Sequence, residues 1–322
     1  MADGGDIFVY LGGDQVVPQH VTHVIIDRSV NIIPERAFYE RERLMTVKMH
    51  EGIERIEGLA FYCCFSLRKI NLIGVREIGR GAFYDCVSLT NVEFGDELEI
   101  IRRKAFNKCV SLQKITMPSV RTIEERAFDG CTAMTDLEFG NNLESIPNYA
   151  LRSCSNLRRI AIPLKDNIFP LNNDEQLRYT QFAGCSNLRT VDLVGIHKTI
   201  SSLLLKRWRT VMNQEIYRIN QMLLMTPCHE KVDSIMRWIR TVIDRMEHYK
   251  AEHYRVLKED MTQLELAIWK AKLDEKDDDN SNQQVQTKKA KIDVESARKE
   301  RRIKSGADII IRNVLPFLQL LE

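Results

Sequence analysis

The feature that most constrains the fold of this chain is a unit of 22 or 23 residues that recurs between about residues 21 and 195. One cysteine marks each unit, and consecutive cysteines lie 22, 23, 22, 23 and 31 residues apart. Large apolar residues stand three positions before and three positions after each cysteine, as in "GAFYDCVSL". The marking cysteines are Cys64, Cys86, Cys109, Cys131, Cys154 and Cys185. A unit this short cannot bury its own apolar face, so the period predicts a solenoid whose coils pack against their neighbours.

An earlier unit lacks the cysteine. Phe38 and Leu44 keep the two apolar positions, and Arg41 occupies the place of the cysteine. We interpret this unit as an end repeat, because a terminal coil faces solvent on one side and tolerates a charged residue there.

A short alternating segment, such as "LRKINL" or "LQKITM", follows the second apolar residue of each unit. Alternation of this kind predicts a strand with one buried face and one outward face. The sequence therefore predicts an α/β repeat solenoid over residues 21–197, with parallel strands on its concave face. An N-terminal strand or cap over residues 1–20 precedes it, and a C-terminal α-helical module follows.

The outward residues of these strands form two predicted rows, because stacking places equivalent positions of successive units side by side. One row is mainly basic, and the other turns acidic after Lys48. Both signs are present, whereas a nucleic-acid groove is mainly basic, so we expect a protein or peptide partner rather than a nucleic acid. The candidate partner-binding residues are Thr46, Lys48, Lys69, Asn71, Asn91, Glu93, Lys114, Thr116, Asp136, Glu138, Arg159 and Asp192.

The repeating pattern resembles the leucine-rich repeat of the BspA-like, or Treponema-type, class over about residues 21 to 195. The opening "FVYLGGDQVVPQHVTHVIIDRSV" and the later "GADIIIRNVLPFLQL" are also similar to a large family of intracellular proteins of this class in diatoms. The resemblance implies a repeat fold and a broad role. It supplies no functional site.

The regular phase of the cysteines favours a structural role over a catalytic one. A row of small, weakly polar thiols suits the inside of a tight turn. A reducing compartment argues against disulfides, and a linear row argues against a tetrahedral zinc site. Cys63 and Cys228 fall outside the row; greater reactivity is one interpretation of them, and ordinary solvent-facing or buried thiols are the favoured one. No phosphate-binding loop, metal motif or nucleophile stands out, so we predict no cofactor and no enzyme.

Helical spacing replaces the coil period after residue 197, in a predicted helical module of residues 198–273. One helix is predicted from residue 201 until just before Pro227, and a longer one from about residue 229 to 273. Ile235, Ile239 and Val242 begin an apolar stripe that needs a partner helix. We expect an intramolecular bundle because the stripe is not a strict heptad, with a homo-oligomer through the long helix as the alternative.

Three further segments stand apart from these modules. An insertion near residues 163–178 adds eight residues to one unit, and either a tolerated loop or a binding element fits it. Residues 274–287 are predicted to be an acidic flexible linker, and residues 288–322 a basic segment with an apolar C-terminal helix. The candidate nuclear localisation residues are Lys288, Lys289, Lys291, Arg298, Lys299, Arg301 and Arg302, and an exposed charged helix is the alternative interpretation of the same segment.

Charge and hydropathy narrow the class of function. The net charge of +2, from 47 basic and 45 acidic residues, creates no global field toward nucleic acid or anionic membrane. The start is not signal-like, and no uninterrupted apolar run is long enough to span a membrane, so we expect an intracellular protein, cytoplasmic or nuclear. A non-enzymatic protein-protein interaction scaffold is the favoured function. The alternative is a nuclear or nucleic-acid-associated adaptor acting through the basic segment.

Overall fold

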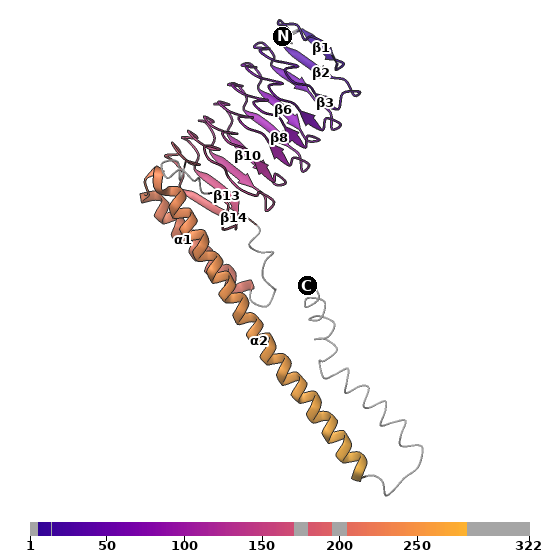
Figure 1. Ribbon diagram of the computed structural model, residues 1–322, viewed down its shortest axis with the longest axis vertical. Coiled ribbons are helices and arrows are strands. Elements are labelled where there is room, and N and C mark those ends of the chain that lie inside the picture. Colours follow the sequence, from indigo (N-terminus) through magenta and orange to yellow (C-terminus); the bar gives the residue numbers. More distant parts are fainter. Residues whose placement is uncertain (1–5, 14, 171–179, 195–204, 282–322) are drawn as a thin grey trace, which may run out of the picture. The chain divides into compact units, whose positions relative to one another are not determined.

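The computed structural model describes residues 6–13, 15–170, 180–194 and 205–281. The chain divides into two compact units, Met1–His253 and Tyr254–Glu322. The first unit contains every described strand and the first described helix (Figure 1).

The predicted strands stack in parallel, one to each coil (Figure 1). One sheet contains, in order, β1 (Ile7–Tyr10), β2 (His23–Ile26), β4 (Thr46–Lys48), β6 (Lys69–Leu72) and β8 (Asn91–Phe94). A second contains β10 (Lys114–Met117), β12 (Asp136–Phe139), β13 (Arg159–Pro163) and β14 (Thr190–Val194). The parallel-strand solenoid followed by helices is therefore confirmed, with its strand ladder divided between β8 and β10.

A third parallel sheet of two-residue strands was not predicted. It forms at an isoleucine that stands five residues before the first large apolar residue of the unit. Hydrogen bonds join these short segments from coil to coil. Its strands are β3 (Ile32–Ile33), β5 (Arg55–Ile56), β7 (Glu77–Ile78), β9 (Ile100–Ile101) and β11 (Thr122–Ile123). The coils that contain β2, β4, β6, β8 and β10 therefore have two hydrogen-bonded sides.

The turn between those two sides places a large apolar residue of each coil inside the solenoid, and in most coils this residue is a phenylalanine. The rings of Phe38, Phe61, Phe83, Phe106 and Phe128 stack nearly parallel, with centroids 4.8 to 5.4 Å apart. The chain reaches this geometry through left-handed residues two positions before and two positions after the ring. Lys104, for example, has a φ of 59°, where the preceding coil has Gly81 at 61°.

The six cysteines form the predicted buried row of free thiols. Each Sγ donates a hydrogen bond to the carbonyl of the large apolar residue in the preceding coil, as Cys86 does to Phe61 and Cys109 to Phe83, both at 3.1 Å. In the first unit, Arg41 supplies this donor, since its Nε lies 2.6 Å from the carbonyl oxygen of Val17. We call this row of thiols the cysteine ladder.

The prediction that Cys228 lies outside the row of cysteines was wrong. Its Sγ donates to the carbonyl of Phe182 at 3.2 Å, which is the bond that defines the ladder. Because a whole helix separates Cys228 from Cys185 in sequence, its spacing concealed its place. Cys228 adds one more level to the ladder, beyond the last coil.

Two long helices follow the solenoid. α1 (Leu205–Met225) ends as predicted, and η3 (Cys228–Glu230) leads into α2 (Lys231–Ser281). Residues 274–281 are therefore helical, and the predicted linker begins too early at 274. Inside the first unit, the stripe of α2 is buried in the same apolar core as Ile219 and Leu223 of α1, which confirms the intramolecular packing.

The helices also close the last coil of the solenoid. The side-chain oxygen of Asn220 accepts a hydrogen bond from the backbone N–H of Val191 in β14 at 2.9 Å. Lys231 is buried, and its Nζ donates to the carbonyls of Ser186 and Leu188 at 3.1 and 2.6 Å. These polar side chains therefore form hydrogen bonds with backbone groups that would pair with a further coil if one followed.

Candidate functional site

The strand face is the outward surface of β1 to β14 in the first two sheets. Strand pairing aligns Thr46 with Lys69 and Lys69 with Asn91 in one row, and Asn71 with Glu93 in the other. In the second sheet the aligned rows are Lys114, Asp136, Arg159 and Thr190, and Thr116, Glu138, Ala161 and Asp192. The register therefore forms the two rows expected from alternation.

Exposure divides these rows into two parts. The exposed residues are Thr46, Lys48, Lys69, Asn71, Asn91, Glu93, Lys114 and Thr116. From β12 onward the outward residues are half-buried or, at Ala161, buried. Arg159 explains part of this difference, because its Nε bonds to the carboxylate of Asp192 at 2.5 Å and its Nη1 to Glu138 at 3.3 Å. The acidic end of the strand face therefore pairs with its own arginine.

The exposed part carries uncompensated positive charge. Lys48, Lys69 and Lys114 face outward together with a single carboxylate, Glu93. Within the described part of the chain, no ion pair of 4 Å or less involves any of these three lysines. This region can therefore offer its lysines to a partner without first breaking a salt bridge.

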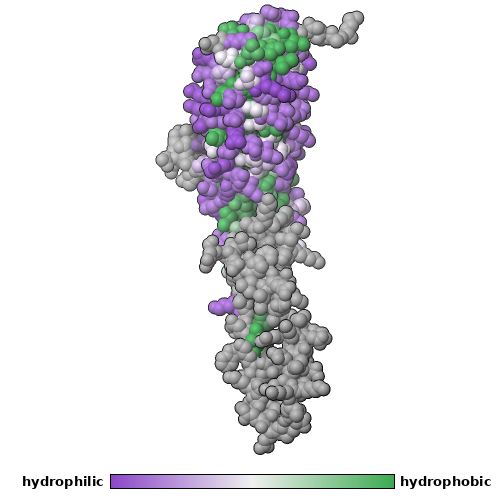
Figure 2. Space-filling view, turned by 90° about the vertical axis from the view of Figure 1, so that its right-hand side faces the viewer, coloured by the Kyte–Doolittle hydropathy of each residue, from purple (hydrophilic) through white to green (hydrophobic). Residues whose placement is uncertain are grey.

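Sequence reasoning missed the N-terminal end of the same face. Pairing aligns Ile7 with His23 and Thr46, and Val9 with Ile25 and Lys48. The side chains of Ile7, Val9 and Ile25 are exposed, at 68%, 47% and 38%. Figure 2 shows hydrophobic residues gathered at the N-terminal end of the solenoid. The repeated alternation in "IFVY" and "HVII" was the signal that could have extended the rows to these residues.

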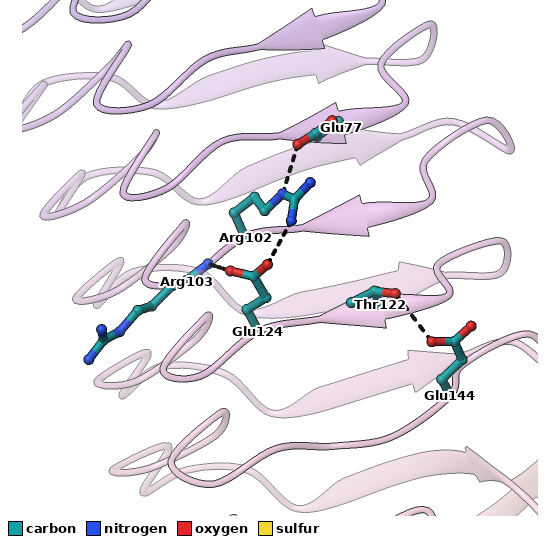
Figure 3. Close-up of polar contacts among 6 residues, drawn as sticks. All are labelled: Glu77, Arg102, Arg103, Thr122, Glu124 and Glu144. Atoms are coloured by element: carbon teal, nitrogen blue, oxygen red, sulfur yellow. Dashed lines mark hydrogen bonds and ion pairs between the residues drawn. The ribbon is translucent and has the colours of Figure 1, made fainter.

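The surface beside the third sheet differs from the strand face because its charges are paired with one another (Figure 3). Arg102 lies between two carboxylates, with Nε 2.7 Å from Glu77 and Nη1 2.9 Å from Glu124. These hydrogen bonds raise the pKa of the Arg102 guanidinium. Glu124 also accepts a hydrogen bond from the backbone N–H of Arg103 at 2.8 Å. A partner would have to compete with these contacts, so this surface is the weaker candidate.

Cys63, a candidate for reactivity, lies in the turn that follows Phe61, beside Tyr62, whose ring stacks on that of Tyr84. Burial raises the pKa of the Cys63 thiol, and it raises the pKa of Tyr62 to about 12. A raised pKa leaves less thiolate at neutral pH. The described surroundings therefore do not activate this cysteine.

Several predicted features lie outside the described residues. These include Asn172 in the insertion and all seven candidate nuclear localisation residues, which fall in 282–322. In the ranges that the structure does describe, no group of three or more histidine, cysteine or acidic residues could hold a metal ion. Among the same residues, no helix is long and apolar enough to cross a membrane.

A family model for repeats of this kind matches the chain. The family model for the BspA type leucine rich repeat region matches residues 18–76 and 76–207, in six copies. A leucine-rich repeat protein from Bacteroides ovatus is 28% identical, with 46% of this chain and 42% of that one covered and a TM-score of 0.40. A leucine-rich repeat protein from Eubacterium ventriosum is 18% identical, with 58% of this chain and 48% of that one covered and a TM-score of 0.44. The T. pallidum leucine-rich repeat protein is 23% identical, with 59% of this chain and 83% of that one covered and a TM-score of 0.36.

The chain spans less than half of the first two of these structures. None of the curated proteins is similar enough to the chain to count as a match.

Proposed function

This chain belongs to the family of BspA-type leucine-rich repeat proteins, and from that premise we propose that it is a non-enzymatic scaffold that binds a protein or peptide on its strand face. The family supports a role in protein interaction. The proposal that the partner binds the strand face rests on the exposed side chains of that face.

One observation carries this choice of surface. On β4, β6, β8 and β10, eight outward polar side chains stand exposed at the alternating positions of the strand face, and the lysines among them have no described ion-pair partner. An exposed ion pair contributes only about 0.2 to 1 kcal/mol, so affinity would come from several contacts acting together. Specificity would come from their register along the solenoid.

We also propose an intracellular location. All eight cysteines are free, and six of them are buried thiols that the fold uses without oxidation. Buried reduced thiols suit a compartment that keeps cysteines reduced. Measuring the thiol content of the native protein from its own cells tests this proposal, since oxidised pairs would contradict it.

A charge-reversal experiment tests the proposed surface. Lys69→Glu combined with Lys114→Glu should reduce partner capture in affinity purification followed by mass spectrometry, because both lysines are exposed on the strand face. The fold should persist because neither side chain packs in the apolar core. Circular dichroism and the melting temperature check that the variant is folded.

The matched control reverses two exposed arginines that lie in turns outside the strands, Arg43→Glu combined with Arg80→Glu. This control changes the net charge equally and should leave capture unchanged. If the control loses the same partners, net charge is responsible. If both variants keep every partner, the strand face is not the binding surface.

A further inference from the structure

We propose that the partner presents an extended segment whose apolar side chains pack on Ile7, Val9 and Ile25, and whose acidic side chains, about three or four residues further along, pair with Lys48 and Lys69. This inference rests on the proposed function and specifies the class of partner. We call the three apolar residues the apolar patch.

The apolar patch is unusual because it occupies outward positions of a sheet whose other exposed positions are polar. Its members lie in the same rows as Thr46 and Lys48, so they share the strand face rather than a separate side of the solenoid. Solvent-exposed Leu11, at 60%, follows directly after β1. Contiguous exposed apolar side chains next to polar ones are typical of an interaction site.

Charge complementarity identifies the second part of the partner. Lys48 lies on β4, the strand next to the patch, and Lys69 lies on β6, one strand further along; the acidic end of the face is occupied by Arg159. The part of the face that remains open is therefore apolar and then basic. A segment that combines apolar and acidic side chains complements it, whereas a basic segment would meet the lysines with like charge.

Strand spacing sets the distance between the two kinds of side chain. Neighbouring strands lie about 4.8 Å apart, so the middle of β1 and β2 is roughly 10 Å from the middle of β4 and β6. An extended chain advances about 3.3 Å per residue, which makes this distance about three residues. The separation of three or four residues in the proposal follows from this estimate.

The open edge of β1 is occupied by a side chain, which argues for binding on the face rather than addition of a strand. The backbone N–H of Leu11 donates to the Oε1 of Gln15 at 2.7 Å, and the Nε2 of Gln15 donates to the carbonyl of Val9 at 3.4 Å. A parallel strand added at Tyr10 would use these same two backbone groups. An incoming strand, or β1 of a second copy, would first have to displace Gln15.

A selection from a display library of random dodecapeptides, with the full chain as bait, tests this inference. We expect the enriched peptides to combine large apolar residues with aspartate or glutamate three or four residues away. Synthetic versions of these peptides should then bind Val9→Thr/Ile25→Thr about tenfold more weakly, as expected for loss of part of the buried apolar area. Threonine keeps the β-branched shape that suits a strand.

The basic part is tested with Lys48→Glu/Lys69→Glu, which should also weaken these peptides about tenfold, with a loss that shrinks at high salt because exposed charges are screened. The matched apolar control is Ile73→Thr/Val110→Thr. It removes two exposed apolar side chains, at 44% and 37%, that lie outside the strands. The control should bind as the native chain does.

Each other outcome overturns the inference in a distinguishable way. If only the lysine variant loses the peptides, the strand face binds but the apolar patch does not contribute, and the partner class is wrong. If neither variant changes binding, the proposed function fails as well. If light scattering shows a native dimer that Val9→Thr/Ile25→Thr converts to a monomer, a second copy covers the patch. If peptides bind only after removal of residues 306–322, the chain's own apolar C-terminal sequence is the occupant.

Discussion

A buried thiol bonded to a carbonyl of the preceding coil is the residue-scale element that recurs throughout the solenoid, and it couples the fold to pH. Burial raises the pKa of Cys64 to about 12 and raises the pKa values of Cys86, Cys109 and Cys131 as well. In the unfolded chain, a thiol has a pKa of about 8.5. Each of these cysteines therefore binds its proton more tightly in the folded state.

We predict that the free energy of unfolding falls steeply as the pH rises above about 8.5. The unfolded state loses these thiol protons and the folded state keeps them, so stability is fully present below that pH and declines above it. The slope should be on the order of 1 kcal/mol per pH unit for each thiol. Urea unfolding between pH 7 and about 10, below the range where tyrosines add to the effect, measures it.

Cys109→Ala provides the matched variant for this pH dependence. It should lower stability at neutral pH, and its slope above about pH 8.5 should be smaller than that of the native chain by one thiol's share. An unchanged slope would show that Cys109 does not contribute to the alkaline loss.

Backbone conformation supplies a second prediction at the residue scale. Lys104 has the left-handed φ that Gly81 has in the preceding coil, and a side chain makes this conformation costly. We expect Lys104→Gly to raise the free energy of unfolding by about 0.5 to 1 kcal/mol, since relief of strain exceeds the added entropy of the unfolded chain. Lys104→Ala keeps the strained Cβ and should give no comparable gain in urea unfolding. Equal gains from both variants would contradict this explanation.

At the scale of elements, the terminal strands and coils are completed by side chains rather than by further coils. Gln15 contacts the edge of β1, Asn220 contacts β14, and Lys231 contacts the last coil. An exposed edge strand invites pairing with another chain, so these contacts limit association at the ends.

Replacing Lys231 tests the C-terminal closure. Lys231→Met keeps most of the side-chain length and removes the donor, which leaves the carbonyls of Ser186 and Leu188 without this partner. We expect a loss of about 2 to 3 kcal/mol in urea unfolding, as for buried polar groups that lose a hydrogen bond. Lys258→Met, at an exposed position of the same helix, should change stability by less than about 0.5 kcal/mol. Equal losses would show that the buried bonds are not responsible.

At the scale of the whole molecule, one apolar core runs from Tyr10 to Val242 and joins the solenoid to the helices of the first unit. Repeat proteins derive their stability from contacts between neighbouring repeats and need capping elements for solubility. The helices after the solenoid therefore belong to its folding unit.

Truncation tests that conclusion. A chain ending at residue 197 loses α1 and all of α2, including the buried first part of α2, which exposes the apolar side of the last coil. We expect it to aggregate in size-exclusion chromatography or to unfold at lower urea than a chain ending at residue 281. A monomeric 1–197 chain with an unchanged urea midpoint would show that the solenoid does not need its helical cap.

The sequence by itself determined the coil, the cysteine ladder through Cys185 and the two rows of the strand face. These features depend on local patterns repeated every 22 or 23 residues, so each unit reinforced the interpretation of the others. The two-residue strands of the third sheet escaped detection because alternation needs a longer segment to be visible.

Only the tertiary structure decided which of the outward residues stay exposed. Arg159 pairs with carboxylates 21 and 33 residues away, and nothing in the local pattern predicts such pairs. The same holds for Cys228 and Lys231, which contact residues 43 to 46 positions away after the chain has turned through α1. Contacts of this kind form only when the whole chain packs, because distance in space rather than spacing in sequence selects the partners.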